Sequence, residues 1–372
     1  MIHNFTGGII PSGRLPRNDI ALNIFASDGE KVAEPATKPI NEYTREELIA
    51  AVQTLGVFDS RRNKYLCDVL SQTDVSERVV INCCESDPYA VSTSALCLDN
   101  IEQLMLGSAV LLYAFSAQKV IFCCDKRSKA LIAQIKKRVG SRKDMALAVI
   151  ADKYPINTRT LIGALYCAGN VYTQNVDIRK YAVISAEAAI KLYDGLCSGI
   201  KQDNKTFSLL VDGEPPVAVK APVGTALLDI LRDFGIAVSA DCIVGYGSTY
   251  NFKSIRLENA RVEADTERIR IACAVRRYEA GECIRCGRCS AVCPLQLDVM
   301  RAVVSDGKRK PKKLEACFEC GCCTYICPSR IDVMQLIKSI KSIRSINEIE
   351  PEPETEHIQT EEQHDEQPDI TV

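Results

Sequence analysis

Eight cysteines near the C-terminal end of the sequence form two copies of one motif. Each copy has the spacing C-x2-C-x2-C-x3-C and is followed directly by a proline. The copies consist of Cys283, Cys286, Cys289, Cys293 and Pro294, and of Cys317, Cys320, Cys323, Cys327 and Pro328. A glycine and an Asp-Val-Met triplet recur with them, so the first copy reappears 34 residues later. Aligned cysteines in both copies indicate a duplicated metal site rather than a helical repeat.

The spacing of these cysteines suits [4Fe–4S] clusters, in which each of four irons takes one thiolate. Three cysteines at intervals of three residues surround three corners of a cluster within one loop. In the bacterial two-cluster arrangement the fourth cysteine of each motif binds the other cluster. A zinc ribbon would instead need two separated C-x2-C pairs. We therefore predict two [4Fe–4S] clusters, the first bound by Cys283, Cys286, Cys289 and Cys327, and the second by Cys317, Cys320, Cys323 and Cys293.

Other residue types restrict the function further. The three histidines, His3, His357 and His364, lie near the two ends, which argues against a Ser-His-Asp triad or a His-ligated zinc. Nineteen cysteines would suggest disulfides in a small secreted protein, but this chain is large and residues 1–14 carry no signal pattern. The longest apolar run, Met105 to Phe115, is expected to be a core helix. We therefore expect a cytoplasmic protein, peripheral on the cytoplasmic face of a membrane at most, that contacts the membrane only through partner subunits.

Residues 41–203 alternate between strand and helix patterns. Thr44 and Glu47 form a capping box before a helix that runs through Leu55. Strands are expected at Val79–Asn82, Val120–Phe122 and Met145–Ile150, and helices at about Asn100–Ala117 and Ser128–Val139. Alternation of this kind predicts an α/β fold, with a parallel sheet covered by helices.

After Asp203 the pattern changes to a small ββαβ unit. Two strands, Phe207–Val211 and Val217–Lys220, flank a turn, and Thr225 is expected to cap a helix through Phe234. A further strand is expected at about 238–244. This unit resembles a β-grasp module of the SLBB type.

The sequence therefore divides into five segments. They are a shortened N-terminal segment (1–40), the α/β domain (41–203), the β-grasp module (204–272), a small helical ferredoxin-like domain for two clusters (273–345) and an acidic tail (346–372). The ferredoxin-like domain ends in an amphipathic helix, expected at Ile331–Ile343. The tail has ten acidic residues and no Lys or Arg from Asn347 onward, which predicts disorder.

The order of these parts resembles the C subunit of the Rnf electron transport complex. Its relatives include cobalamin reductase and electron-transfer partners of proline reductase. The resemblance is strongest at the two cysteine motifs, and residues 80–89 are similar to the family's N-A-x-E-x-E-P-Y stretch. In that family the α/β domain is similar to the flavin-binding subunit of respiratory complex I, holds FMN and accepts a hydride from NADH. The resemblance implies that Asn82, Glu85 and Asp87 lie near the flavin.

Two segments depart from the family pattern. The family's glycine-rich G-x-G-G-A-x-F-P loop would follow Gly56-Val57, but Phe58–Lys64 contains no glycine. A phosphate cradle needs glycine so that backbone N–H groups can approach the ligand. A Gly-Gly-Glu segment of the family is replaced by Ile156–Arg159. Two interpretations of Glu85 and Asp87 follow, a flavin site and a solvated turn at a strand end.

A basic stretch, Lys308–Lys313, lies between the two cysteine motifs. Such a stretch is typical of a solvated loop, and it would also serve as a docking site for an acidic carrier such as ferredoxin or flavodoxin. No aromatic or helix-turn-helix pattern supports nucleic acid as a partner.

We expect an electron-transfer protein that relays electrons through two [4Fe–4S] clusters as a peripheral subunit of an Rnf-like oxidoreductase complex. No side chain is expected to act in acid–base catalysis. One alternative is an FMN-dependent NADH oxidoreductase that feeds the same clusters. Another is a non-redox interaction protein in which the clusters are structural.

Overall fold

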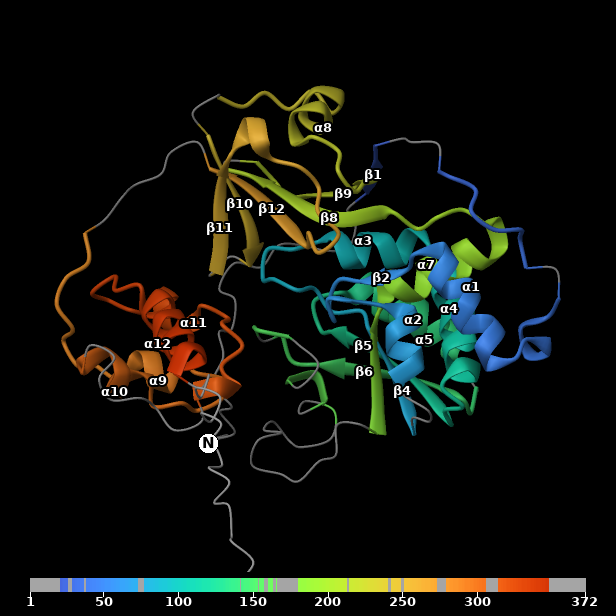
Figure 1. Ribbon diagram of the computed structural model, residues 1–372, viewed down its shortest axis with the longest axis horizontal. Coiled ribbons are helices and arrows are strands. Elements are labelled where there is room, and N and C mark those ends of the chain that lie inside the picture. The colour runs from blue at the N-terminus through green and yellow to red at the C-terminus, as the bar shows by residue number, and fades with distance from the viewer. Residues whose placement is uncertain are drawn as a thin grey trace, which may run out of the picture.

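The computed structural model describes most of the 372-residue chain. The described residues are 21–25, 29–36, 38–72, 77–140, 142–152, 154–156, 160–162, 165, 180–212, 214–239, 242–248, 251–272, 279–305 and 314–347. The basic stretch, the acidic tail, residues 1–20 and most of the segment 156–159 lie outside them. Figure 1 shows three parts: a helix-covered sheet, a second sheet above it, and the cysteine motifs to one side.

A four-stranded parallel sheet forms the centre of the largest part. Its strands are β4 (Arg78–Asn82), β5 (Lys119–Asp125), β6 (Met145–Ile150) and β7 (Tyr181–Ser185), in the order β6-β5-β4-β7. All three pairings are parallel, which confirms the predicted α/β fold and its first three strands. The chain adds β5 and β6 on one side of β4 and then returns to place β7 on the other side. The sheet therefore has a switch point between the carboxyl ends of β4 and β7.

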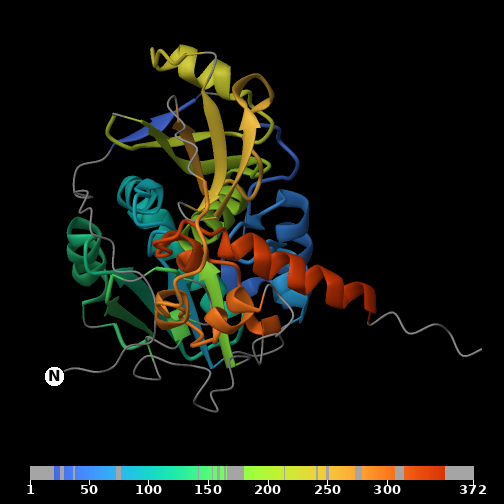
Figure 2. The same ribbon diagram turned by 90° about the vertical axis from the view of Figure 1, so that its left-hand side faces the viewer.

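Helices cover both faces of this sheet (Figure 2). They are α1 (Arg45–Leu55), α2 (Leu66–Gln72), α3 (Ser92–Asp99), α4 (Ile101–Ala114), α5 (Lys129–Val139) and α7 (Ala186–Ser198), with a short η1 turn at Ile40–Glu42. The capping box of Thr44 and Glu47 is present at the start of α1. The helix expected at 100–117 ends at Ala114, and α3 precedes it at an angle of 91°. The bend lies at Asn100, whose backbone is not helical.

A small hairpin connects α1 with α2 and lies where the family's glycine-rich loop was expected. It consists of β2 (Phe58–Asp59) and β3 (Lys64–Tyr65), and its four-residue tip begins with Ser60 and Arg61. Asp59 anchors the hairpin, because its carboxylate accepts hydrogen bonds from the backbone N–H groups of Ser185 (2.9 Å) and Arg61 (3.0 Å). Burial raises the pKa of Asp59 despite these bonds. The tip is thereby held against the carboxyl end of β7.

The second sheet has six strands and its own hydrophobic core. Its strands, in the order β1-β9-β8-β12-β10-β11, are β1 (Leu22–Ile24), β9 (Val217–Pro222), β8 (Asn204–Val211), β12 (Arg268–Ala272), β10 (Ile243–Ser248) and β11 (Asn251–Arg256). Helix α8 (Leu227–Asp233) and the η3 turn (Leu257–Asn259) contribute to the same core. Strand β1 comes from the N-terminal segment and pairs in parallel with β9.

Two local predictions for this sheet were wrong. Thr225 does not cap α8, because the helix begins at Leu227 after Ala226 and has no side-chain cap. The backbone carbonyl of Thr225 instead accepts a hydrogen bond from Val262 (2.9 Å). The strand expected at 238–244 begins at Ile243, since the apolar residues before it pack on the core from a loop rather than from a strand.

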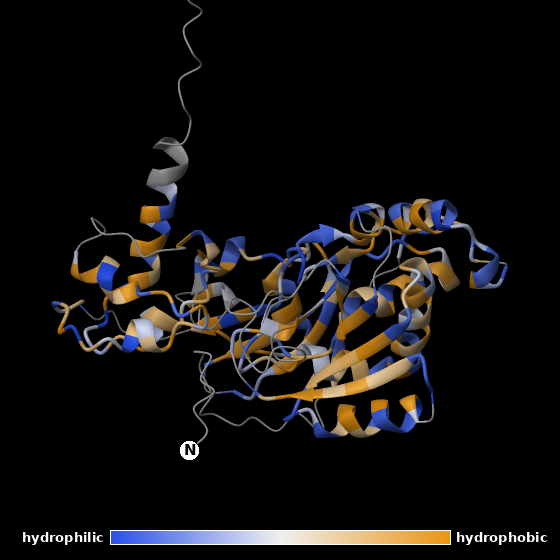
Figure 3. Ribbon diagram, turned by 90° about the horizontal axis from the view of Figure 1, so that it is seen from below, coloured by the Kyte–Doolittle hydropathy of each residue, from blue (hydrophilic) through white to orange (hydrophobic). Residues whose placement is uncertain are grey.

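The cysteine motifs form a small helical part with a separate core. Its elements are α9 (Arg288–Ala291), α10 (Val299–Val304), the η4 turn (Leu314–Ala316), α11 (Cys322–Tyr325) and α12 (Val333–Asn347). The amphipathic helix expected at Ile331–Ile343 is therefore present as α12. Hydrophobic and hydrophilic residues alternate along it in Figure 3. Its residues Ile337 and Ile340 are buried against the motifs.

Across the described ranges, no single helix is long and apolar enough to cross a membrane. Helices α3 and α4 have the length and apolar composition of a membrane-spanning helix only when the two are counted together. Half of the α4 residues, including Leu104 and Leu111, are buried in the core. The run Met105–Phe115 is thus a core segment, as expected from its length.

Helices α4 and α7 touch so closely that one position in α4 must be glycine. A Cβ atom added to Gly107 would lie 1.9 Å from the carbonyl oxygen of Ala189 in α7. We therefore expect Gly107→Ala to lower the free energy of unfolding by about 1–3 kcal/mol, the usual cost of overpacking. Urea unfolding followed by circular dichroism measures this change. Gly281→Ala is the control, since its Cβ would meet its nearest atom at 3.9 Å. Equal stability of the two variants would contradict the packing argument.

Candidate metal centres and polar pocket

The first predicted set of cysteines surrounds one cavity. Cys283, Cys286 and Cys289 line it from the first motif, and Cys327 lines it from the second. The other walls of the cavity are mainly apolar side chains such as Met300 and Ile331. The structure thus brings together the four cysteines that the crossed assignment groups. Their binding of one cluster stays a prediction.

The second predicted set is also brought together. Burial, followed by the proximity of Cys320, Cys317 and Cys293, raises the pKa of Cys323 to about 12. Burial and the same neighbours Cys320 and Cys317 raise the pKa of Cys293. Four thiols this close would repel one another as thiolates, and bound cationic iron removes that cost. Within the described ranges, no three Cys, His, Asp or Glu side chains are arranged to hold a single metal ion.

The backbone of the two motifs has the same unusual conformation at matching positions. Gly287 and Gly321 have φ angles of 73° and 78°, in the left-handed region that favours glycine. Arg285 and Glu319 are also left-handed, with φ angles of 57° and 56°. These reversals turn each loop around its cysteines. The repeat seen in the sequence is therefore a repeat in conformation.

One hydroxyl residue supports each loop, and sequence reasoning missed both. The Oγ of Ser290 accepts a hydrogen bond from the N–H of Met300 (2.8 Å) and lies 3.3 Å from the carboxylate of Asp298. Thr324 makes the matching bond with the N–H of Met334 (2.7 Å), and its Oγ1 lies 3.3 Å from the Asp332 carboxylate. The sequence does contain a signal for these two residues, because each directly follows the third cysteine of its motif.

The second motif is attached to neighbouring elements by two side chains. The hydroxyl of Tyr154, which follows β6, donates a hydrogen bond to the carbonyl of Cys320 (2.8 Å). Lys341 from α12 donates to the carbonyl of Cys317 (3.1 Å) and to the carboxylate of Glu319 (2.6 Å). The second loop is therefore attached to the α/β part through Tyr154 and to α12 through Lys341.

A polar pocket lies at the switch point of the parallel sheet, the usual place for a ligand in such folds. Asn82 at the end of β4 and Ser185 at the end of β7 line it, together with Arg61 from the hairpin tip. Lys205 from β8 and Glu267, directly before β12, line it from the second sheet. Both sheets therefore contribute side chains to the pocket.

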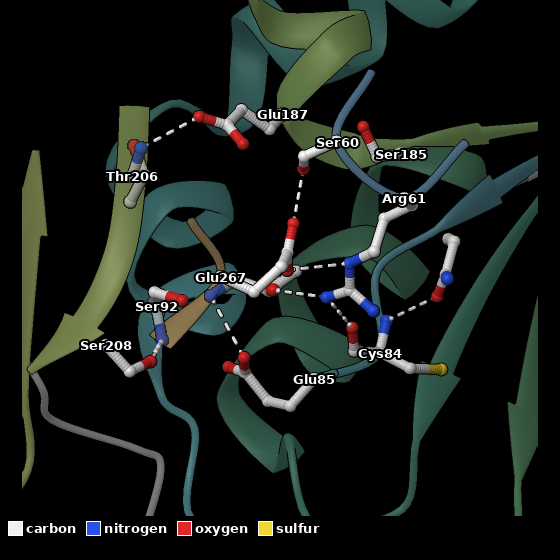
Figure 4. Close-up of polar contacts among 12 residues, drawn as sticks. Ser60, Arg61, Cys84, Glu85, Ser92, Ser185, Glu187, Thr206, Ser208 and Glu267 are labelled. Carbon is white, nitrogen blue, oxygen red and sulfur yellow. Dashed lines mark hydrogen bonds and ion pairs between the residues drawn. The ribbon is translucent and has the colours of Figure 1, made fainter. Parts of the chain in front are cut away.

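Charged side chains inside this pocket are paired with one another (Figure 4). The Nε of Arg61 lies 2.9 Å from Glu267, and its Nη2 donates to the carbonyl of Cys84 (3.0 Å). Ser60 donates a hydrogen bond to Glu267 as well. Burial alone would raise the pKa of Glu267, but Arg61, Lys205 and the bond from Ser60 lower it to about 2.

Lysine and glutamate side chains extend the network toward α7. Lys205 is almost completely buried and pairs with both Glu187 and Glu267. Lys191, one turn after Glu187, lies 3.2 Å from the same carboxylate. Burial would raise the pKa of Glu187, but Lys191 and Lys205 lower it. The two cations that line the pocket, Arg61 and Lys205, thus already face carboxylates of the chain, and Lys191 pairs with Glu187 beside it.

The three residues that the resemblance placed near a flavin are buried and bonded within the protein. The amide oxygen of Asn82 accepts a hydrogen bond from the N–H of Cys84 (3.1 Å). Asp87 lies 3.9 Å from Arg268 of β12, and both side chains are almost completely buried. The carboxylate of Glu85 accepts hydrogen bonds from backbone N–H groups at the start of α3. The interpretation of Glu85 and Asp87 as a solvated turn is wrong, because both are buried.

The backbone N–H groups of residues 91–94, at the start of α3, already donate hydrogen bonds within the chain and are not available to a phosphate. Glu85 accepts from Thr93 (3.1 Å) and Ser94 (2.8 Å), and Ser208 of β8 accepts from Val91 (2.9 Å) and Ser92 (3.0 Å). A helix start is a common phosphate site, and here a carboxylate of the chain occupies it.

The described part of the pocket does not fit a flavin phosphate. Its cations are paired, the N–H groups of α3 are used, and a further dianion would meet Glu85, Glu187 and Glu267. The Nη1 of Arg61 has no partner among the described residues. A single free N–H falls far short of the several donors that a phosphate group requires.

Family comparisons agree with the order of the parts. Residues 67–177 match the Nuo51 FMN-binding domain, and residues 276–331 match the 4Fe-4S dicluster domain. The second match confirms the predicted iron–sulfur clusters. The first shows that residues 67–177 of the α/β part are similar to a flavin-binding domain, although the pocket has the internal pairs described above.

Curated relatives are named as the C subunit of an ion-translocating oxidoreductase complex. The protein from Buchnera aphidicola is 21% identical over 271 residues, which cover 70% of this chain and 56% of that protein. The protein from Citrobacter koseri is 24% identical over 275 residues, which cover 68% of this chain and 37% of that protein. The predicted resemblance to the C subunit of the Rnf complex is confirmed. The chain spans about half, or less, of the length of these relatives.

Solved structures show the same fold at low identity. The NAD+-reducing [NiFe]-hydrogenase in its air-oxidized state superposes with a TM-score of 0.54 and 13% identity, covering 86% of this chain and 60% of that one. The same hydrogenase in its H2-reduced state superposes with a TM-score of 0.51 and 15% identity, covering 84% of this chain and 56% of that one.

Cysteines outside the two predicted sets are mostly core residues. Cys83, Cys84, Cys123 and Cys124 are completely buried at the ends of β4 and β5, as expected for small core side chains. Cys322 is also buried, and its thiol forms a hydrogen bond that lowers the pKa of Cys320.

The crossed assignment predicts which pairs of substitutions lose the same cluster. Cys327→Ala should remove about four of about eight irons, because one [4Fe–4S] cluster loses its fourth ligand. Adding Cys283→Ala should remove no more iron, whereas adding Cys317→Ala should remove the rest. Iron and acid-labile sulfide analysis measures both.

Cys322→Ala is the matched control and should keep all of the iron. Uncrossed binding gives the reverse pattern for the two double variants. Zinc without labile sulfide in the unaltered protein would contradict the assignment altogether.

Glu267→Gln tests the buried network. We expect Glu267→Gln to lower the free energy of unfolding by about 3–5 kcal/mol at pH 7, because Arg61 and Lys205 lose a buried partner. The pKa of Glu267 is lowered from 4.5 to about 2, so its contribution is complete above pH 4.5 and disappears as the pH falls toward 2. Urea unfolding measured from pH 7 to pH 3 should therefore show that the difference in free energy of unfolding between the unaltered protein and Glu267→Gln shrinks below about pH 4.5. Glu258→Gln, at an exposed position, is the control. If Glu267→Gln lowered the free energy of unfolding equally at every pH, Glu267 would not carry the buried negative charge assigned to it.

Proposed function

We propose that this chain is an electron-transfer subunit that relays electrons through two [4Fe–4S] clusters in an Rnf-like redox complex. The observation that carries the proposal is the grouping of the eight cysteines into two sets of four, each with three members from one motif and one from the other. Such sharing places two clusters close together, as an electron relay requires. Bound clusters supply one-electron chemistry, and the residues of this chain hold and cover them.

The three parts of the chain support this proposal in different ways. We assign residues 41–203 to an α/β domain, 204–272 to a β-grasp module of the SLBB type, and 273–345 to the two-cluster domain, between an N-terminal segment (1–40) and an acidic tail (346–372). The two sheets form a rigid support through the buried network of Arg61, Glu267 and Lys205. Tyr154 fixes the second cysteine set to that support.

We further propose that electrons enter from a partner rather than from a flavin in the same chain. The internal pairs of Arg61 and Lys205, and the capping of α3 by Glu85, support this. The partners are a carrier such as ferredoxin or flavodoxin, or other subunits of the complex, and not nucleic acid. We place the protein on the cytoplasmic face of the membrane, in contact with it only through partner subunits.

A second candidate function is an NADH oxidoreductase that uses FMN to feed the same clusters. The match of residues 67–177 to a flavin-binding domain favours it. The paired charges of the pocket argue against it.

Anaerobic purification followed by visible spectroscopy, flavin extraction and addition of NADH tests the proposal. We expect cluster absorption, less than about 0.1 flavin per chain and no bleaching by NADH, because the phosphate donors of the pocket are already used. A reduced ferredoxin should bleach the clusters. Stoichiometric FMN with bleaching by NADH would favour the second candidate instead. Clusters that no reduced carrier bleaches would support a structural role.

A further inference from the structure

The two cysteine loops differ in how much of each is covered. In the second loop, Phe318, Glu319 and Cys320 are each partly buried, and Cys322 is 1% exposed. Tyr154 and Lys341 hold this loop against the rest of the chain. The second loop therefore has little surface to offer to a partner.

The matching positions of the first loop are open to solvent. Ile284 is 67% exposed, and Arg285, Cys286 and Arg288 are exposed as well. Within the part of the chain that the structure describes, Arg285 and Arg288 make no ion pair or side-chain hydrogen bond. Glu282 is the exposed acid nearest to them in sequence, so positive charge predominates from residue 282 to residue 289.

Building on the relay function proposed above, we propose that Ile284, Arg285 and Arg288 form the docking surface for an acidic one-electron carrier protein. We call these three residues the first-loop surface. Electron transfer between proteins slows steeply with distance, so docking must occur where a cysteine set lies nearest to solvent. Cys286 is exposed, and its set is the one that this surface covers.

The composition of the first-loop surface suits a brief encounter with a negatively charged protein. Redox encounters use small interfaces, in which charge sets the association rate and the orientation. Ile284 provides an apolar centre, and the two arginines provide a positive rim. The second loop has Phe318, Glu319 and Cys322 at the matching positions, so it lacks both arginines. The two loops share their cysteine spacing but not this charge.

Docking leads to a simple redox step. Cys283, Cys286, Cys289 and Cys327 would hold an iron–sulfur group that could accept one electron from the reduced carrier. The carrier would then be oxidised by one electron and this chain reduced by one. No covalent bond forms or breaks, and no proton has to move.

Charge reversal at the rim is the direct test. Arg285→Glu is compatible with the backbone, because Glu319 occupies the matching position of the second loop with nearly the same φ angle. The double variant Arg285→Glu/Arg288→Glu should bind an acidic two-cluster ferredoxin at least about tenfold more weakly at low ionic strength. The difference should shrink at about 0.5 M salt, because screening weakens charge interactions between exposed groups. Isothermal calorimetry with the cluster-loaded full chain measures this binding without relying on electron transfer.

The matched control changes the net charge equally at a distant site. Arg232 in α8 and Arg256 in β11 have exposed side chains, and Arg232→Glu/Arg256→Glu should change the dissociation constant less than about twofold. Iron content and visible absorption confirm that each variant keeps its clusters. If Arg288→Glu disturbs the neighbouring Cys289, Arg285→Glu alone should still weaken binding and remain salt-dependent.

Equal weakening by both double variants would overturn the proposal, because net charge alone would then explain the effect. Unchanged binding of the Arg285→Glu/Arg288→Glu variant would overturn it too, and the relay function would stand if ferredoxin still reduced the clusters. Failure of ferredoxin to reduce the clusters of the unaltered protein would instead count against the relay function itself.

Discussion

The need of each [4Fe–4S] cluster for four thiolates governs the architecture of the C-terminal part. One short loop supplies three sulfurs, and the fourth comes from the other motif. The structure meets this need by bringing Cys327 to the first loop and Cys293 to the second. The two loops must therefore fold together, and their shared core holds them in place. Tyr154 attaches the second loop to the α/β part of the chain.

A network of buried, paired charges connects the two sheets. Arg61 and Lys205 face Glu187 and Glu267 between the two sheets, at the switch point where related folds bind ligands. A buried charge is costly unless it is paired, so each member holds its partners in position. The hairpin tip that carries Arg61 lies where the family resemblance led us to expect a glycine-rich loop. The pairs of Arg61 and Lys205 with Glu267 connect this region with the second sheet.

The sequence alone predicted the features that local patterns determine. Cysteine spacing predicted an iron–sulfur domain, which the family comparison confirms, and alternation predicted β4, β5 and β6. Both patterns depend on near neighbours in the chain. The charge network was not predictable, since Arg61 and Glu267 are more than 200 residues apart and only the fold brings them together. The covering of the second loop by Tyr154 was hidden for the same reason. Thr225 shows that a local pattern can also mislead. Its residue type favours a helix cap, but its backbone carbonyl accepts a hydrogen bond from Val262 and α8 begins two residues later.

The number of electrons that the chain accepts tests the central claim most directly. Anaerobic titration with titanium(III) citrate, followed by visible and electron paramagnetic resonance spectroscopy, counts these electrons. Two clusters without a flavin should accept two electrons per chain, one for each cluster, with no flavin absorption. Uptake of about four electrons per chain, with a flavin among the reduced species, would contradict the account.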